Sequence, residues 1–292
     1  MKLFNFPKMS IYQIILIFVL IILLLGVLIY FFQEKFFFHP EKLPFDFNFE
    51  YENLVATEKM VETEPGAMID YLHFKTEKPL QGLIFYLKGN TKSIKGWGKF
   101  AIDFTRLGFD VIMLDYRGFG KSTGRRNSDA MKRDIQAIYN EAKKEYDENE
   151  IIVYGRSLGS GYASMLAAKN RPKMLILASP VYSLISTVRR YLPFMPARPF
   201  MRYNIPTHKY LKAVTCPVKI IHGSNDNLIP LKSVVSLSNV NPEKTRLYII
   251  LGAGHINIHQ YEDYHRIMEE ILIGKNIEIH KEETSLGFSH RK

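Results

Sequence analysis

The longest apolar run in the chain lies near its amino terminus. Residues 11–32 contain no charged side chain and offer no polar face beyond Gln13 and Gly26. About twenty helical residues, each rising about 1.5 Å, cover the roughly 30 Å hydrocarbon core of a bilayer. The pattern therefore predicts a transmembrane anchor over 11–32, preceded by a short tail over 1–10 and followed by a juxtamembrane connector over 33–54.

A cleaved signal peptide is the alternative interpretation of this segment. Such a leader has a shorter apolar stretch that ends in small residues, and the sequence from Gln33 to Phe38 offers no site of that kind. We therefore expect a retained anchor and a membrane localisation. Lys2 and Lys8 precede the span, whereas acidic and basic residues are mixed after it, so the positive-inside rule predicts that the large domain faces the non-cytoplasmic side.

From about residue 55 onward, short apolar runs alternate with longer amphipathic runs. This alternation predicts an α/β domain over 55–274, built on a mostly parallel sheet with helices on both faces. The expected strands are 58–63, 69–75, 83–87, 111–115, 151–154, 174–178, 218–222 and 247–251, and the expected helices are 96–107, 128–146, 158–169, 231–237 and 258–273.

One segment interrupts the alternation. Residues 181–211 mix basic and aromatic side chains with four prolines, and they lie between two expected strands. We interpret them as a small cap insertion over the carboxyl edge of the sheet that admits an acyl chain and approaches the membrane surface. A surface excursion that only packs on the sheet is the alternative. Residues 275–292 are expected to form a polar tail.

The strongest chemical signal is Ser157, which lies in Gly155-Arg156-Ser157-Leu158-Gly159 between an expected strand and an expected helix. This G-x-S-x-G pattern is typical of a nucleophile elbow, where a tight turn exposes the serine and the next helix aims free N–H groups at the reaction centre. Asp226 and His255 each follow a later strand, in the chain order that this elbow requires. All three side chains are therefore expected at the carboxyl edge of the sheet.

Together these motifs resemble the α/β-hydrolase fold serine hydrolases, and within them the membrane-anchored abhydrolase-domain group with depalmitoylase-like and lysophospholipase-like members. The resemblance runs from about Val55 to Ile273 and implies an eight-stranded sheet that begins with an antiparallel hairpin. It is carried by Leu87–Asn90, Asp115–Ser122, Gly155–Gly159, His222–Asp226 and Gly252–His255.

The resemblance implies a role for each site residue. Ser157 is expected to be the nucleophile, His255 the general base and then acid, and Asp226 the carboxylate that orients the imidazole. The oxyanion hole is expected to use the backbone N–H groups of Leu158 and Asn90.

Two local features bear on these assignments. Many relatives carry His where this chain has Lys88, and we expect this change to affect the surroundings of the loop more than its chemistry, because the hole uses backbone donors. The strand before that of Asp226 ends at Ser179-Pro180, without a carboxylate. This absence favours Asp226 as the acid.

Other patterns do not support a cofactor, a metal or a nucleic-acid partner. His255 and His259 have helical spacing, but the glutamate of H-E-x-x-H is missing. Gly120-Lys121-Ser122 ends like a phosphate loop, yet Asp115 stands where that loop needs glycine. The net charge of +10 has no recognition motif beside it, and attraction to anionic head groups explains it better.

The sequence thus predicts a membrane-anchored serine hydrolase that cleaves ester or thioester bonds, with lipid-like acyl substrates, through an acyl-enzyme intermediate. A serine peptidase of the same fold is the alternative within the enzymes, and a non-catalytic binding protein that keeps the fold is the alternative outside them. Acyl-chain length and oligomeric state stay open at this point.

Overall fold

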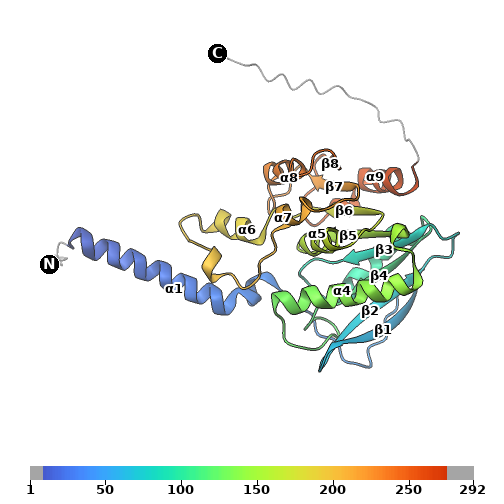
Figure 1. Cartoon of the computed structure of the whole chain (residues 1–292), viewed down its shortest axis with the longest axis horizontal. Coiled ribbons are helices and arrows are strands. Elements are labelled where there is room, and N and C mark those ends of the chain that lie inside the picture. Colours follow the sequence, from blue (N-terminus) through green and yellow to red (C-terminus); the bar gives the residue numbers. More distant parts are fainter. Residues whose placement is uncertain (1–8, 275–292) are drawn as a thin grey trace, which may run out of the picture.

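The computed structural model describes residues 9–274 of the 292-residue chain, so the expected polar tail lies outside the described residues. A long helix, α1 (Ile11–Phe37), projects from an α/β domain (Figure 1). Ser10 and Gln13 cap its first turn, since the Ser10 hydroxyl accepts from the Gln13 N–H and the Gln13 side chain accepts from the Ser10 N–H. Among the described residues, α1 has the length and apolar composition to cross a membrane, criteria that a signal sequence also meets.

The domain is built on one eight-stranded sheet, mostly parallel as expected. The strand order is β1-β2-β4-β3-β5-β6-β7-β8, and the pairs β1–β2 and β2–β4 are antiparallel. The central strands are buried on both faces because side chains alternate between two separate cores. The strands are β1 (Val55–Glu64), β2 (Ala67–Lys75), β3 (Gly82–Leu87), β4 (Phe109–Leu114), β5 (Ile151–Arg156), β6 (Met174–Ala178), β7 (Val218–Gly223) and β8 (Thr245–Ile250).

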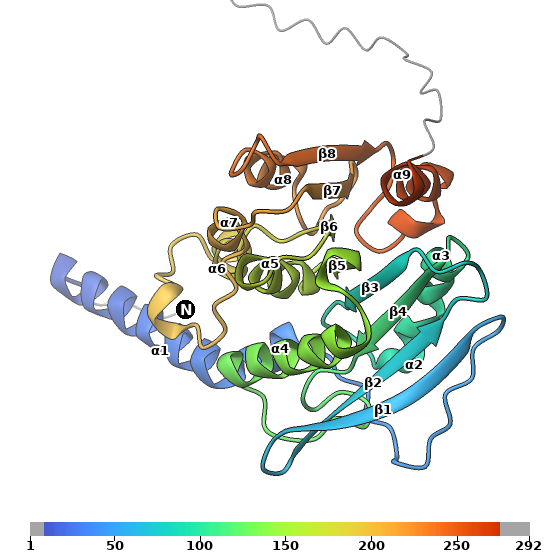
Figure 2. The same cartoon turned by 45° about the vertical axis from the view of Figure 1, so that its right-hand side comes forward.

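Helices cover both faces of the sheet, as Figure 2 shows. On one face, α4 (Ser128–Glu145), α5 (Gly159–Lys169) and α8 (Leu231–Ser238) bury apolar side chains in a core that includes Leu83, Phe85 and Leu87 of β3. On the other face, α3 (Ile102–Thr105) and α9 (Glu262–Ile273) pack over the intervening β3 residues Ile84 and Tyr86.

Two expected helices differ in detail. The helix expected over 96–107 is three short pieces, α2 (Ile94–Trp97), a 3₁₀ turn (Gly98–Ala101) and α3. Glycines at 96 and 98 explain the break, because glycine disfavours a helix interior and the Tyr51 ring fills the space beside Gly98. The helix expected over 258–273 opens with a 3₁₀ turn before α9 begins at Glu262.

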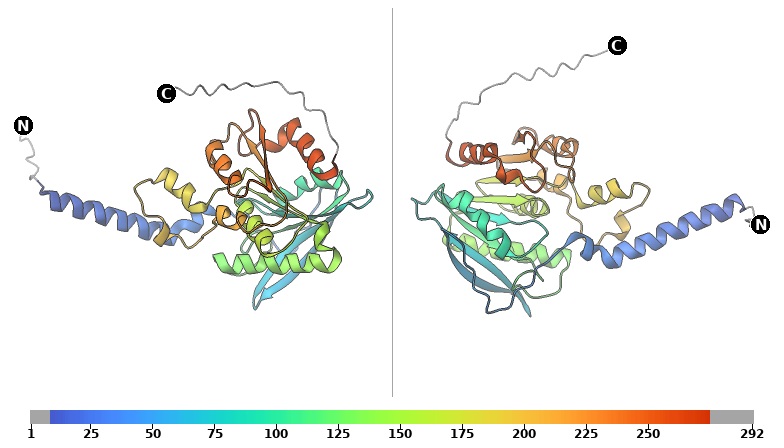
Figure 3. Two further views of the ribbon diagram at one scale, coloured as in Figure 1. Left: turned by 45° about the horizontal axis from the view of Figure 1, so that its top comes forward. Right: turned by 180° about the vertical axis from the view of Figure 1, so that it is seen from behind.

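The segment 181–211 contains three short helices, α6 (Leu184–Tyr191), a 3₁₀ turn η3 (Arg198–Phe200) and α7 (Thr207–Leu211). The turn η3 packs against α1, and α7 packs against α5. Two further views show that α1 meets the domain beside this segment (Figure 3).

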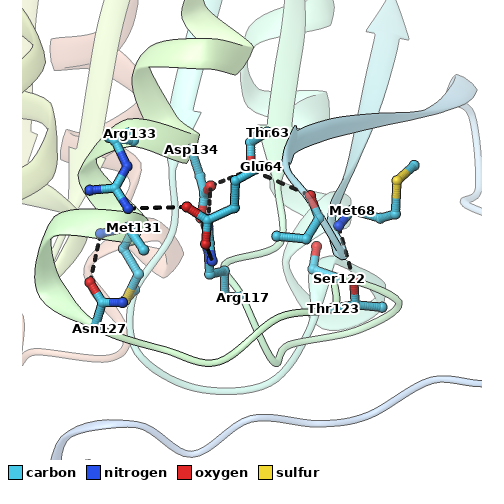
Figure 4. A network of polar contacts seen from close by, with 12 residues as sticks. Thr63, Glu64, Met68, Arg117, Ser122, Thr123, Asn127, Met131, Arg133 and Asp134 are labelled. Atoms are coloured by element: carbon cyan, nitrogen blue, oxygen red, sulfur yellow. Dashed lines mark hydrogen bonds and ion pairs between the residues drawn. The ribbon is translucent and has the colours of Figure 1, made fainter.

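Arg117 connects β1 to α4 on the side of the hairpin (Figure 4). Its guanidinium is buried, donates to the Asp134 carboxylate of α4 at 2.8 Å and pairs with Glu64 of β1. Arg133 also reaches Glu64, at 3.1 Å. Arg117 belongs to the Asp115–Ser122 motif, so this part of the motif joins the hairpin to the helical layer.

Candidate active site

Ser157 occupies the turn between β5 and α5. Its φ angle of 51° lies in the left-handed region, which costs roughly 1–3 kcal/mol for a residue other than glycine. Two backbone hydrogen bonds hold the turn, one from the Ser157 N–H to the Ala178 carbonyl and one from the Ser160 N–H to the Ser157 carbonyl, both at 3.0 Å. The turn places Ser157, partly exposed, at the carboxyl edge of the sheet.

The glycines on either side make this turn possible. A Cβ at Gly155 would lie 2.5 Å from the Cβ of Ala163, and a Cβ at Gly159 would lie 2.1 Å from the Leu87 carbonyl oxygen. Both distances are shorter than a van der Waals contact. Therefore α5 can approach β5 and β3 this closely only where the side chain is a hydrogen atom.

The three side chains expected to act together lie in one hydrogen-bonded chain. Ser157 Oγ is 2.9 Å from His255 Nε2, and His255 Nδ1 is 2.7 Å from Asp226 Oδ2. A neutral imidazole with its proton on Nδ1 satisfies both contacts, because Nδ1–H donates to the carboxylate and Nε2 accepts from the hydroxyl. This arrangement can move a proton from the serine to the histidine.

Asp226 is buried and held in its ionised form. Its second oxygen, Oδ1, accepts from the N–H groups of Leu228 at 2.9 Å and Ile229 at 2.8 Å. Burial acts to raise the pKa of Asp226, but the hydrogen bonds from His255 and from the Ile229 N–H outweigh it and hold the pKa below its ordinary value. The carboxylate is therefore charged at neutral pH and can fix the orientation of the imidazole.

His222 lies behind this carboxylate. It is fully buried, its Nε2 donates to the Ile229 carbonyl at 3.0 Å, and its Nδ1 is 3.8 Å from Asp226 Oδ2. Burial lowers the pKa of His222. Its neutral ring therefore packs against the acid loop without competing for the bond to His255.

The two backbone donors expected to form the oxyanion hole are unengaged. Within residues 9–274, neither the Leu158 N–H nor the Asn90 N–H donates a hydrogen bond. The loop that carries Asn90 passes beside the nucleophile, since a Cβ at Gly89 would lie 3.8 Å from the Ser157 Cβ. Both N–H groups are thus free to bind an oxygen.

The buried side chain of Lys88 stabilises the loop that carries Asn90. Its side chain is completely buried, with Nζ 3.2 Å from Asp115 Oδ1, 3.0 Å from the Lys92 carbonyl and 4.0 Å from the centroid of the Phe119 ring. Burial lowers the pKa of Lys88 and raises the pKa of Asp115. Each charge compensates the other, so Asp115 and Lys88 hold the loop without contacting the triad.

The end of α1 holds the same loop from the other side. Asn90 Nδ2 donates to the carbonyl of Phe37, the last residue of α1, at 2.7 Å. The His39 N–H donates to the Asn90 carbonyl, and the Lys92 N–H donates to the His39 carbonyl, both at 2.9 Å. The chain just after α1 is therefore part of the framework of the candidate site.

Arg156 is a site residue that sequence reasoning missed. Its side chain is buried, with the guanidinium about equally far from the rings of Trp97 and Phe100, 5.5 and 5.4 Å from their centroids. Nη2 donates to the carbonyl of Ile256 at 2.6 Å. Because Ile256 follows His255, Arg156 ties the elbow to the histidine loop.

The histidine pair considered for a metal does not converge on one point. His259 Nδ1 lies 3.2 Å from Arg156 Nη1, whereas His255 faces Ser157 and Asp226. Burial and the neighbouring Arg156 lower the pKa of His259 to about 4, so its ring is neutral. Among the described residues, no group of three or more His, Cys, Asp or Glu side chains is arranged to hold a metal ion.

Two open grooves flank α6 near the acid loop. A groove of about 490 Å³ lies between α6 and α8, where Arg190 and Lys232 face Leu228 and Ile229. A second groove, of about 420 Å³, is lined by basic side chains on the other side of α6, among them Arg189, Arg198 and Lys209.

Known proteins resemble this chain in sequence and in fold. A family model described as serine aminopeptidase, S33, matches residues 78–209, which include the Asn90 loop and the Ser157 elbow. The chain has the α/β-hydrolase fold. The hydrolase is 27% identical over 199 residues to an uncharacterized protein of Mycobacterium tuberculosis, a match that covers 67% of this chain and 71% of that protein.

Two further relatives have more informative names. Alpha/beta hydrolase domain-containing protein 17C of Xenopus tropicalis is 26% identical to the hydrolase over 214 residues, covering 72% of this chain and 67% of the relative. Lysophosphatidylserine lipase ABHD12 of Rattus norvegicus is 26% identical over 220 residues, covering 65% of this chain and 55% of the relative.

Solved structures share the fold. A Pyrococcus furiosus esterase superimposes with a TM-score of 0.65 and 19% identity, covering 82% of the hydrolase and 98% of the esterase. Est1E of Butyrivibrio proteoclasticus, solved with ferulic acid bound, gives a TM-score of 0.61 and 19% identity over 74% of the hydrolase and all of that chain. At these identities the likeness establishes the shared α/β-hydrolase fold.

Proposed function

We propose that this hydrolase is membrane-anchored and cleaves ester or thioester bonds of lipid-like acyl substrates. The observation that carries the proposal is the chain of hydrogen bonds Ser157–His255–Asp226 beside two unengaged backbone donors. In this assignment Ser157 is the nucleophile, His255 the base and then acid, and Asp226 the orienting carboxylate.

The proposed reaction has two steps. Ser157 Oγ attacks the acyl carbon while its proton moves to His255 Nε2, and the oxygen of the tetrahedral intermediate accepts hydrogen bonds from the N–H groups of Leu158 and Asn90. The intermediate then collapses, and the leaving alcohol or thiol takes the proton from His255. In the second step water attacks the acyl-enzyme with His255 again as base, which releases the carboxylic acid and restores the serine hydroxyl.

The substrate class is inferred from names and from composition. One relative is named as a lysophosphatidylserine lipase, and two proteins of the same fold are an esterase and a protein solved with ferulic acid. The grooves beside α6 carry both apolar and basic side chains. These features support an acyl substrate near a membrane surface.

The packing of α1 supports a retained anchor. Gln33 is completely buried, and its side chain bonds to the backbone of Phe200, Arg202 and Tyr203. Phe38, one residue beyond α1, lies in the main core. A leader removed near these residues would take part of the packing with it. With Lys2 and Lys8 ahead of the span, we propose that the domain faces the non-cytoplasmic side.

A fluorophosphonate probe tests the nucleophile. The full-length protein in detergent should be labelled, and Ser157→Ala should lose all labelling, because the probe reacts with an activated serine. Hydrolysis of acyl esters and thioesters of graded length should fall by a factor on the order of 10⁴ or more in Ser157→Ala. Ser164→Ala, a buried serine on α5, is the matched control and should label normally. An unlabelled wild type would favour a non-catalytic binding protein.

A peptidase is the second candidate, because the matching family model is described as a serine aminopeptidase. The same chain of hydrogen bonds can act on amides. Aminoacyl nitroanilides assayed beside the acyl esters separate the two candidates. Turnover of the nitroanilides alone, lost in Ser157→Ala, would replace the esterase proposal.

A further inference from the structure

We propose that the tip of the cap, defined here as Tyr191–Phe200, inserts into the bilayer that α1 crosses, at the level of the lipid head groups and the upper acyl chains. The proposal rests on the membrane anchoring in the proposed function. It identifies an interaction surface, the cap tip, and a partner, a lipid bilayer containing anionic lipid.

The contacts between η3 and α1 set the depth of the tip. A Cβ at Gly26 would lie 2.5 Å from the ring of Phe200, so the ring rests directly on the helix backbone. Gln33 Nε2 donates to the Phe200 carbonyl at 3.1 Å. Gly26 and Gln33 are seven residues apart, which is roughly 10 Å along the helix. Phe200 therefore extends toward the middle of the apolar span.

Charged side chains lie at the end of this contact that is nearer the domain. Arg202 Nη2 lies 2.9 Å from Glu34 Oε1, and Arg126 lies 3.5 Å from the other oxygen of Glu34. Charges of this kind belong at or above the head groups. Since Phe200 reaches Gly26 while Arg202 holds Glu34, the cap tip crosses the boundary between the aqueous and apolar zones of α1.

The tip itself presents apolar side chains to its surroundings. Tyr191, Leu192 and Phe194 are 60%, 37% and 83% exposed. In water this cluster would leave a large apolar area hydrated. Aromatic rings are favoured at the membrane interface, where one edge meets lipid and the other meets water. The exposure of these three residues is therefore explained by lipid contact.

Basic side chains lie next to the cap tip and within it. Arg189 and Arg190 lie in the last turn of α6, and Arg198 begins η3. None of the three forms an ion pair with a described residue. A cation near an anionic membrane surface is attracted to the lipid head groups. Their position next to the tip matches the plane of the head groups.

A lipid bilayer suits this surface better than a soluble partner. The tip is continuous with α1 through Phe200, and a soluble protein that covered it would have to enter the layer occupied by Gly26. The basic side chains beside the tip would also attract anionic lipid head groups, which favours a bilayer as the partner.

Depth-dependent fluorescence quenching tests the proposal on the full-length protein in nanodiscs. An environment-sensitive dye is attached at Phe194→Cys, and the discs contain phosphatidylcholine and phosphatidylglycerol with a spin label high or low on the acyl chain. The wild type is the labelling control because Cys216 is buried. Leu80→Cys is the matched site, since Leu80 is 56% exposed in the loop before β3, at the opposite edge of the sheet.

The dye at position 194 should be blue-shifted and should lose most of its emission with the shallow spin label, whereas the dye at position 80 should respond only to an aqueous quencher. Adding Arg189→Glu and Arg190→Glu should abolish any gain in quenching from phosphatidylglycerol. Equal access of the aqueous quencher to both sites would overturn the proposal, and so would protection of position 194 without spin-label quenching, which indicates a protein partner.

Labelling of Ser157 by the fluorophosphonate on the same discs keeps this test separate from the proposed function. Quenching at position 194 without labelling of Ser157 supports the cap tip and contradicts the hydrolase chemistry. Labelling of Ser157 without quenching at position 194 contradicts the insertion of the cap tip and supports the hydrolase activity. Failure of the chain to enter nanodiscs contradicts the anchor and the cap tip together.

Discussion

Arg156 lies next to Ser157 in the sequence, yet its guanidinium contacts the loop of His255. The side chain leaves the end of β5, lies beside the rings of Trp97 and Phe100 and donates to the carbonyl of Ile256. A planar guanidinium suits this place, since it can face aromatic rings while donating in its own plane. Holding the residue after His255 restricts where the imidazole can move.

Replacing Arg156 is expected to impair catalysis more than substrate binding. In Arg156→Met the apolar stem remains but the bond to Ile256 is lost, so kcat on a soluble acyl ester should fall about 10- to 100-fold with little change in KM. Arg156→Lys keeps the charge but not the planar group, and it should recover only part of kcat. Unchanged kcat in a folded Arg156→Met protein, checked by its melting temperature, would contradict this role.

At the scale of elements, the loop after β3 is fixed by segments from distant parts of the chain. Lys88 and Asp115 form a buried pair beneath it, Trp97 donates to the Thr91 carbonyl at 2.8 Å, and the end of α1 binds Asn90 above it. An oxyanion hole works through donors that are already in place before charge develops. The supports on this loop supply that rigidity.

The contact between Asn90 and α1 gives a prediction at this scale. Asn90→Ala keeps the backbone N–H but removes the bond from the Asn90 side chain to the Phe37 carbonyl. We expect kcat to fall about tenfold while KM stays within about twofold, because the donor becomes less well placed only for the transition state. Affinity for a boronic acid that mimics the tetrahedral intermediate should fall in parallel. Loss of substrate affinity without loss of boronic acid affinity would disprove the expectation.

Much of this architecture follows from local sequence signals, and some of it does not. Runs such as Ile151–Tyr154 and Met174–Ala178 predict buried strands well, because apolar strands of a parallel sheet end where glycine or polar residues begin. The grouping of Ser157, Asp226 and His255 at one edge follows from their place after strands.

Contacts between distant segments left no such local signal. Arg156 and Ile256, or Asn90 and Phe37, pair only after the chain has folded, and no periodicity links them. The apolar pattern also ended the predicted anchor at residue 32, although α1 continues to Phe37. Gln33 and Glu34 look like the start of a connector in the sequence, but they are helical because the cap satisfies their polar groups.

At the scale of the whole molecule, one buried carboxyl group opposes folding at neutral pH. Asp70 on β2 is fully buried, and neither of its carboxyl oxygens has a hydrogen-bond partner among the described residues. Burial raises the pKa of Asp70 to about 8, with Glu58 and Asp115 adding to the effect and Lys121 opposing it. The folded protein therefore keeps a proton on Asp70 that the unfolded chain releases above about pH 4.

The sign of the resulting pH dependence follows from proton binding. Between about pH 4 and pH 8 the folded state binds more protons at Asp70 than the unfolded state, so the Asp70 contribution to stability decreases as pH rises through this window. Asp70→Asn should remove the decrease and raise the free energy of unfolding at pH 8 by on the order of 5 kcal/mol, because each of about four pH units contributes about 1.4 kcal/mol. Urea unfolding of the detergent-solubilised protein across the range checks this, and parallel pH curves for the two proteins would refute it.

The junction between α1 and the domain has a mechanical consequence. Gln33 is hydrogen-bonded to the cap and Phe37 to the loop of Asn90, so α1 is joined to the candidate site without a free linker. If α1 crosses a bilayer as proposed, the geometry of this helix fixes the distance between Ser157 and the bilayer surface. In the function proposed above, a substrate therefore has to present its scissile bond at one fixed distance from the bilayer.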